Sequence, residues 1–189
     1  MEFVEPIRDK RKIEAMKLVL RGSNLRDYCL FVLGINSGLR VSDLLRLTIE
    51  DVLNEKGKVL DRITIREKKT GKTKTFPISS NSKKAIEEYL QKRGSYLRSE
   101  PLFISRKGNT AIQRVQAWKA LNNAAKAVGI KDRIGTHTLR KTFAYHAYKQ
   151  GKDITLIQKL LNHSAPSVTL RYIGITQDEM DDVYLTLNL

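Results

Sequence analysis

Several residues whose side chains suit phosphate chemistry follow one another along the chain. They are, in chain order, Arg40, His137, Arg140, His163 and Tyr172. A guanidinium can bind two phosphate oxygens at once, an imidazole can carry a proton, and a phenol can act as a nucleophile. Each of these residues alone is most often an ordinary surface or core residue. Their occurrence as an ordered set is what points to chemistry at a phosphate.

The spacing within the set adds to this reading. His137 and Arg140 are three positions apart, which places both side chains on the same face of a helix. Arg40 follows a Ser-Gly break and stands where the next helix begins. A tyrosine hydroxyl has a pKa of about 10 and is a poor nucleophile at neutral pH. When the tyrosine attacks a phosphodiester, negative charge develops on the phosphate oxygens in the transition state. Two fixed guanidiniums, Arg40 and Arg140, would stabilise this charge.

The overall charge favours a polyanionic partner. Lys and Arg number 35 against 20 Asp and Glu, a formal net charge of +15 on 189 residues. Such a field attracts nucleic acid, and the release of counterions from phosphates drives the binding. Cys29 is the single cysteine, so no disulfide forms within the chain. No signal peptide or membrane span is recognisable, and we expect a cytoplasmic protein.

Hydrophobic periodicity predicts a mainly helical chain. Helices are expected over residues 8–20, 25–35, from Ser42, 81–90, 112–128, 136–150, 153–161 and 167–173. Between Val59 and Ile78 the period changes to the alternation of a β-hairpin whose tip is Lys68–Lys72, and a short third strand is expected at Leu102–Ser105. Without the short segment from Ser42, these are about seven helices, and the strands number three. The expected fold class is therefore α+β, mainly α with a small antiparallel sheet.

Four stretches in this order resemble the tyrosine recombinase, or phage integrase, family. They are SGLRVSDLLRL (37–47), KKTGKTKTFPI (68–78), THTLRKTFA (136–144) and LLNHSAPSVTLRYIG (160–174). The resemblance covers nearly the whole chain. It implies the catalytic-domain fold of that family and site-specific DNA recombination, by integration and excision or by inversion. One departure is Asn162, where the family usually has glycine.

The resemblance also implies a role for each residue. Tyr172 is the expected nucleophile, which forms a 3′-phosphotyrosine intermediate, and His137 is its acid-base partner. His163 would hydrogen-bond the scissile phosphate. Asp43 resembles the family's supporting carboxylate, which orients the basic groups of the site.

A lysine on the hairpin tip is the expected general acid. The departing 5′ oxygen needs a proton, and nearby arginines can lower the pKa of a lysine that delivers it. The resemblance places this lysine immediately before Thr-Gly, at Lys69, while Lys68 and Lys72 remain alternatives. Arginines then neutralise the charge that Mg²⁺ neutralises in many phosphoryl transfers, so we expect no metal and no cofactor.

The expected partner is double-stranded DNA. The residues expected to contact it are Lys68, Lys72, Lys74, Arg114 and Lys141, and the helix from Arg114 to Lys126 is a candidate for the major groove. The resemblance implies a monomer in solution that assembles into a tetramer on DNA, with DNA-bending accessory proteins as further candidate partners.

Three parts of the chain are expected: an N-terminal linker and first helix (1–23), a catalytic domain (24–174) and a C-terminal tail (175–189) that either docks on a neighbouring protomer or packs on its own domain. Members of the family usually carry an N-terminal core-binding domain, for which the residues before Arg40 leave no room. A catalytic fragment and a short member such as the fimbrial inversion recombinases both fit. In either case we expect weak, salt-sensitive DNA binding.

Other function classes stay open at this point. A DNA-binding regulator in the same fold would have lost cleavage, and a type IB topoisomerase would share the tyrosine chemistry. A two-metal nuclease would need a carboxylate triad, for which Asp43, Asp51 and Asp61 are the candidates. The sequence does not specify the target site or the direction of recombination.

Overall fold

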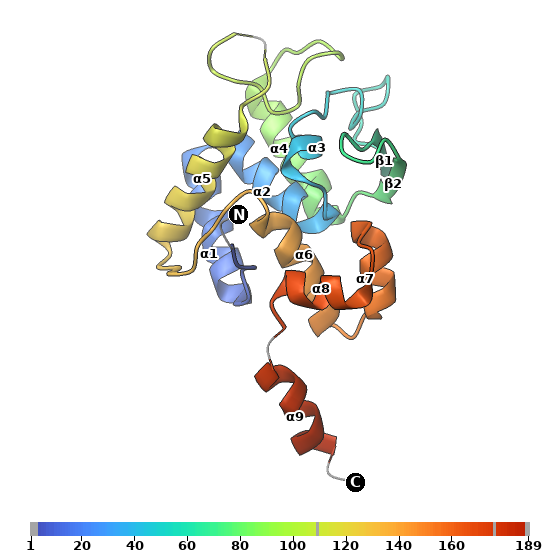
Figure 1. Cartoon of the computed structure of the whole chain (residues 1–189). Helices are drawn as coiled ribbons and strands as arrows, with labels where there is room; N and C mark the ends of the chain where they lie inside the picture. Colours follow the sequence, from blue (N-terminus) through green and yellow to red (C-terminus); the bar gives the residue numbers. More distant parts are fainter. Residues whose placement is uncertain (1–3, 109, 176, 188–189) are drawn as a thin grey trace.

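The computed structural model describes residues 4–108, 110–175 and 177–187. It consists mainly of helices, with one two-stranded hairpin at the edge (Figure 1). The helices are α1 Lys10–Ser23, α2 Leu25–Ser37, α3 Val41–Leu44, α4 Ser80–Arg93, α5 Arg114–Ala127, α6 Thr138–Lys149, α7 Ile154–Leu161, α8 Pro166–Ile173 and α9 Gln177–Leu187. The strands are β1 Arg62–Arg66 and β2 Thr73–Pro77. The predicted fold class is confirmed, and the described residues add helix α9, which was not among the expected ranges.

The predicted third strand, Leu102–Ser105, is wrong. Ile104 forms only an isolated bridge with Ala111, and the antiparallel sheet of the described residues has two strands. The carbonyl oxygen of Pro101 accepts a hydrogen bond from the Arg93 guanidinium at 2.8 Å. The backbone of the segment bonds to isolated residues on two sides, with the N–H of Leu102 donating to the carbonyl oxygen of Leu47 at 2.8 Å and the N–H of Ile112 donating to that of Phe103 at 2.9 Å, so no continuous ladder forms.

The larger hydrophobic core lies between α1, α2, α4, α5 and the hairpin. Helix α2 is apolar on nearly every face because it runs through this core, where Leu30 and Phe31 are fully buried. Helix α1 contributes Met16, also fully buried, and Ile63 of β1 closes the core on the hairpin side. The first helix is thus packed into the same core as α2.

A smaller core holds α6, α7 and α8 together. Its buried residues are Ala144, Tyr145, Ile157, Leu161 and Ile173. The three helices lie next to one another below the hairpin in Figure 1. The residues after position 136 that were expected to do chemistry therefore lie on a unit with a core of its own.

Gly34 of α2 and Gly38, which caps this helix, let α6 pack against the larger core. A Cβ atom at Gly34 would lie 2.5 Å from Cδ1 of Leu139, and one at Gly38 would lie 2.6 Å from Cδ1 of Phe143. Both distances are shorter than real contacts allow, so larger residues would push the two helices apart. This close crossing brings Arg40, which follows α2, next to Arg140 on α6.

Helix α9 extends away from the rest of the protein (Figure 1). Its apolar side chains from Val183 to Leu187 are exposed, from 56% for Val183 to 80% for Tyr184. None of the helices described is both long and apolar enough to cross a lipid bilayer.

Candidate active site

Arg40 is held at the turn between α2 and α3. Helix α2 ends at Gly38, whose φ of 62° is left-handed and favours glycine. Arg40 then forms the N-cap of α3, in extended conformation. Its side chain is only 17% exposed and forms an ion pair with Glu67, in which Nη1 lies 3.1 Å from Oε1. The guanidinium is therefore fixed by backbone and by a partner, as a phosphate-binding group needs to be.

Arg140 joins the two cores. It is 3% exposed, and its Nη1 donates to the carbonyl oxygen of Gly38 at 2.7 Å. Its Nη2 donates to the carbonyl oxygen of Leu161, at the end of α7. Burial lowers the pKa of Arg140 below its usual value, although a guanidinium stays charged in proteins. The buried guanidinium is thus oriented by two carbonyl oxygens, that of Gly38 beside the larger core and that of Leu161 in the smaller core.

His163 follows the sharp end of α7. The helix stops at Asn162, which adopts the left-handed conformation with φ 50°. This is the position of the expected glycine, and asparagine tolerates the conformation better than most residues. Nδ1 of His163 lies 3.0 Å from the hydroxyl oxygen of Thr169. Burial, followed by the charges of Arg140 and Arg40, lowers the pKa of His163 to about 4, so its imidazole is neutral at pH 7.

Tyr172 lies on α8 beside His163. The two ring centroids are 4.9 Å apart and the ring planes meet at 75°. Burial raises the pKa of the Tyr172 hydroxyl, while the charges of Arg140 and Arg40 act in the opposite direction. Nζ of Lys141 lies 5.1 Å from the centre of the Tyr172 ring. The phenol is consequently protonated at neutral pH and lies within the field of the two arginines.

His137 stands at the entrance to α6. It forms the N-cap of the helix and is exposed, with Arg140 one turn further along the same helix. Desolvation of the ring by neighbouring protein atoms, followed by the charges of Arg114 and Arg140, lowers the pKa of His137. A neutral imidazole can accept a proton, which is the state that a base requires.

A pocket of about 490 Å³ opens beside His137. Its lining includes Arg114 and Trp118 of α5, and the Trp118 side chain is 45% exposed. Nε of Arg114 donates to the hydroxyl of Thr136 at 3.0 Å. The N-terminal part of α5 therefore faces the same region as the first histidine.

The lysines of the hairpin fall into two groups. Lys68, Lys69 and Lys72 are exposed on the tip, and no side-chain partner of Lys69 is present among the described residues. Lys74 of β2 instead points toward α7, where its Nζ donates to the carbonyl oxygen of Leu160 at 3.1 Å. Burial and the charge of Arg140 lower the pKa of Lys74 to about 8.

Asp43 holds the hairpin to α3. It is 3% exposed, and its Oδ1 accepts a hydrogen bond from the backbone N–H of Lys68 at 2.8 Å. The other two carboxylates of the hypothetical metal triad have different partners: Asp51 accepts from Thr48, and Asp61 pairs with Lys83. In the ranges described, no group of three or more His, Cys, Asp or Glu residues could hold a metal ion.

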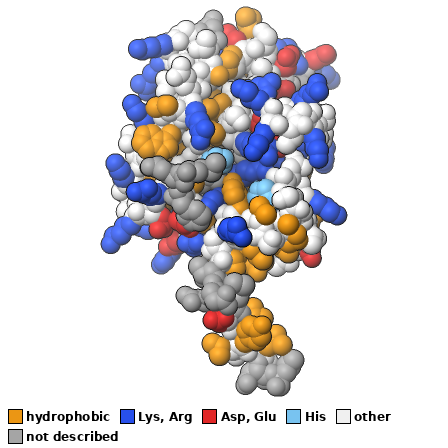
Figure 2. All heavy atoms as spheres, viewed as in Figure 1, with side chains coloured by type: hydrophobic (Ala, Val, Ile, Leu, Met, Phe, Trp, Pro, Cys, Tyr) orange, Lys and Arg blue, Asp and Glu red, His pale blue; other side chains and the backbone are white. Residues whose placement is uncertain are grey.

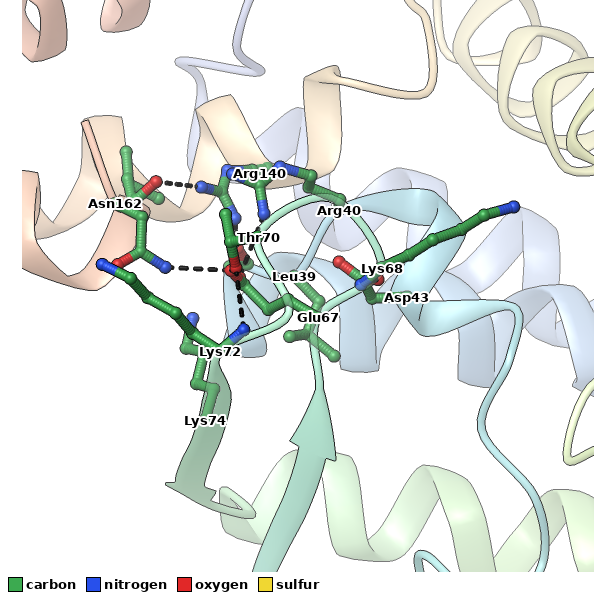
Figure 3. A network of polar contacts seen from close by, with 12 residues as sticks. Leu39, Arg40, Asp43, Glu67, Lys68, Thr70, Lys72, Lys74, Arg140 and Asn162 are labelled. Carbon is green, nitrogen blue, oxygen red and sulfur yellow. Dashed lines mark hydrogen bonds and ion pairs between the residues drawn. The ribbon is translucent and has the colours of Figure 1, made fainter. Parts of the chain in front are cut away.

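Glu67 is a site residue that the sequence analysis missed. Its side chain is fully buried against Arg40, in the polar network drawn in Figure 3. A signal was available in the sequence. Ile63, Ile65 and Glu67 alternate with their neighbours along the strand and its extension, so their side chains are expected on the same, inward face. A carboxylate on the inward face of a strand needs a cation beside it.

The face that carries the site is strongly basic. Figure 2 shows Lys and Arg side chains around histidine side chains near the middle of this face, with apolar side chains gathered on the C-terminal helix. The structure thus brings Arg40, Arg140, His163 and Tyr172 together, with His137 at the edge.

Known proteins share this sequence pattern. The model of the Phage integrase family matches residues 9–179. The chain is 45% identical over 184 residues to the Bacillus subtilis protein named "Probable integrase/recombinase YoeC", and the match covers 97% of both chains. Other matching tyrosine recombinases are longer, and the chain spans about half of their length.

Solved structures share the fold. A crystal structure of XerA recombinase has a TM-score of 0.78 at 21% identity, over all of this chain and 66% of that one. A post-cleavage complex of XerH site-specific recombinase with its palindromic difH substrate has a TM-score of 0.75 at 20% identity, over 96% of this chain and 52% of that one. The fold of the chain is therefore that of these recombinases.

Proposed function

The chain belongs to the phage integrase family and carries a tyrosine recombinase catalytic domain, and on this premise we propose that Tyr172 cleaves and rejoins DNA strands. One observation carries the proposal: the hydroxyl-bearing ring of Tyr172 packs on His163, in the field of two buried or half-buried arginines. The site-specific recombinases of this family act on defined DNA sequences, and the XerH complex contains such a DNA.

The first transesterification conserves the phosphodiester energy. The Tyr172 oxygen attacks the phosphorus, the bond from phosphorus to the 5′ oxygen breaks, and a 3′-phosphotyrosine forms. His137 takes the phenolic proton, as its lowered pKa allows. The 5′ hydroxyl of a second strand then attacks the phosphotyrosine, and the tyrosine oxygen leaves and regains its proton.

Arg40 and Arg140 bind the non-bridging oxygens while negative charge develops on them. The neutral imidazole of His163 donates a further hydrogen bond to the phosphate. If the Thr169 hydroxyl donates to Nδ1, the proton of the His163 ring sits on Nε2 and is available to the phosphate. All three groups are oriented before DNA binds, so little reorganisation is needed during the reaction.

Lys69 is the proposed general acid for the 5′ oxygen, and Lys74 is the rival that its burial and lowered pKa support. A substrate with sulfur in place of the leaving oxygen separates them, because a thiolate departs without a proton donor. Loss of the general acid slows cleavage of the ordinary substrate by about 10² to 10⁴-fold and leaves the sulfur substrate nearly unaffected. Lys69→Ala is expected to show this pattern. The same pattern in Lys74→Ala alone would transfer the role to Lys74.

We propose further that the protein is a monomer in solution and assembles into a tetramer on its DNA sites. Helix α9 exposes Val183, Leu185 and Leu187, which supports docking on a neighbouring protomer over packing on its own domain. Truncation after Gly174 should then abolish protein-protein crosslinking on DNA. Unchanged crosslinking would contradict the docking.

A nicked suicide substrate tests the proposed function. The nick lets the 5′ fragment diffuse away, so the covalent intermediate accumulates and appears as a protein-linked band on a denaturing gel. A library of flanking sequences supplies cognate sites. The adduct is expected with the unaltered protein, in the presence of EDTA, and not with Tyr172→Phe. DNA binding without an adduct would favour a non-catalytic regulator, and plasmid relaxation without recombination would favour a topoisomerase.

A further inference from the structure

The carboxylate of Glu67 has one ion-pair partner and two hydrogen-bond donors, from three separate segments. Arg40 Nη1 lies 3.1 Å from Oε1. Oε2 accepts from the hydroxyl of Thr70 at 2.7 Å and from the side-chain amide of Asn162 at 2.9 Å. These contacts are seen together in Figure 3. A single buried group thus links the turn after α2, the hairpin tip and the corner before His163.

The carboxylate stays ionised in this place. Burial raises the pKa of Glu67, but the hydrogen bond from Thr70 and the charge of Arg40 outweigh it, so the pKa lies below the usual value. An isolated buried charge would be very costly, and the ion pair with Arg40 and the two hydrogen bonds are what make the buried anion tolerable. The links therefore persist at neutral pH.

The hairpin tip closes on the backbone of the same residue. The N–H of Glu67 donates to the carbonyl oxygen of Lys72, and the N–H of Gly71 donates to the carbonyl oxygen of Glu67. Asp43 binds the N–H of Lys68 from the other side. The loop that carries Lys69 is therefore anchored at its base by Glu67.

Asn162 ties the same carboxylate to the phosphate-binding histidine. It ends α7 in the left-handed conformation, and His163 is the next residue. A glycine, which the related sequences are expected to carry here, has no side chain that could donate to Glu67. The link between the hairpin and the His163 corner thus depends on an asparagine side chain at position 162.

We propose that Glu67 is a positioning residue, whose carboxylate sets the hairpin tip and the Asn162–His163 corner against Arg40 before DNA binds. The proposal rests on the proposed function, because the groups that it positions are those assigned to the cleavage reaction. Glu67 itself touches neither the nucleophile nor the leaving group. The alternative is that Glu67 competes with the DNA phosphate for Arg40 and holds the site closed.

The variant Glu67→Gln keeps the shape of the side chain and removes its charge. We expect the rate of adduct formation on the nicked substrate to fall about 10- to 100-fold, a fraction of what a whole general acid contributes. The DNA dissociation constant should stay the same or decrease slightly, because the variant is more basic. Asn162→Gly should lower the rate by a smaller factor. Glu100→Gln, which removes another ion-paired carboxylate next to Arg93, is the matched control and should leave the rate unchanged.

The substrate with a sulfur leaving group separates positioning from a purely structural role. If Glu67 aligns the tip that carries the general acid, the defect of Glu67→Gln should be at least about threefold smaller on this substrate, because the proton donor is no longer needed. Faster cleavage by Glu67→Gln would identify a competitor of the phosphate and overturn the proposal. Equal defects on both substrates would also overturn it. Absence of any adduct with the unaltered protein would instead refute the proposed function.

Discussion

Substitution of Gly38 by alanine tests how the close crossing of α2 and α6 builds the site. Gly38 has a φ of 62°, and a Cβ there would lie 2.6 Å from Cδ1 of Phe143. The left-handed conformation costs an alanine about 1–2 kcal/mol, and overpacking costs about 1–3 kcal/mol more. Gly38→Ala should therefore lower the free energy of unfolding by about 2–5 kcal/mol.

Gly57→Ala is the matched control. Gly57 also has a positive φ, 72°, but no atom lies within 4 Å of a Cβ placed there. It should lose only the conformational part, about 1–2 kcal/mol. Urea denaturation gives both free energies, and the adduct assay gives the effect on the site, since the Gly38 carbonyl oxygen binds Arg140. If both variants lose the same free energy of unfolding and Gly38→Ala still cleaves fully, the close packing of Gly38 against Phe143 does not position Arg140.

Three further predictions follow from the site. In Arg140→Lys, no planar group can bind the carbonyl oxygens of Gly38 and Leu161 together. Adduct formation should therefore fall about 10²- to 10³-fold in the gel assay. A loss below threefold would contradict the role of Arg140. The pKa of His163 is about 4 in the folded protein, below its unfolded value. The unfolded state therefore binds more protons between about pH 4 and 6.5. The free energy of unfolding should decrease as the pH falls through this range. His163→Gln should weaken that decrease in urea denaturations at pH 5 and pH 7, and an unaltered decrease would assign it to other groups. DNA affinity measured by fluorescence anisotropy should fall steeply between low and physiological salt, and nanomolar binding by the monomer at physiological salt would contradict the expectation of weak binding.

The residues that form the center of the site were predictable from the sequence because the motifs state both residue type and order. Arg40, Arg140, His163 and Tyr172 come from segments far apart in the chain, and the structure places them in one electrostatic neighbourhood. The motifs do not show why these four residues come together in space. That reason lies in tertiary packing, above all in the two carbonyl oxygens that Arg140 binds.

Two features could not be predicted with the reasoning used. The segment Leu102–Ser105 has the apolar composition of a strand, but it and Pro101 just before it form only isolated bridges, with Ala111 and Thr48, and no ladder. Glu67 was not singled out in the sequence, although it shares the odd-numbered positions of Ile63 and Ile65. Its partners Arg40 and Asn162 lie on other elements and cannot be paired with it from spacing.

Lys141 and Lys74 show the same limit for charged residues. Both were expected to contact DNA because of their charge. The structure places Lys141 over the ring of Tyr172 and Lys74 on the carbonyl oxygen of Leu160. A DNA-contacting role for either residue stays a prediction, since a lysine can pack its stem and still present charge to a phosphate.

Mapping of the DNA-linked residue tests the central claim most directly. The adduct from the nicked substrate would be digested with a protease and a nuclease, and the peptide that carries the nucleotide would be identified by mass spectrometry, with Tyr148→Phe as the control variant. The account predicts a phosphotyrosine linkage at Tyr172 through the 3′ phosphate, formed equally by Tyr148→Phe. A linkage at any other residue, or through a 5′ phosphate, would contradict it.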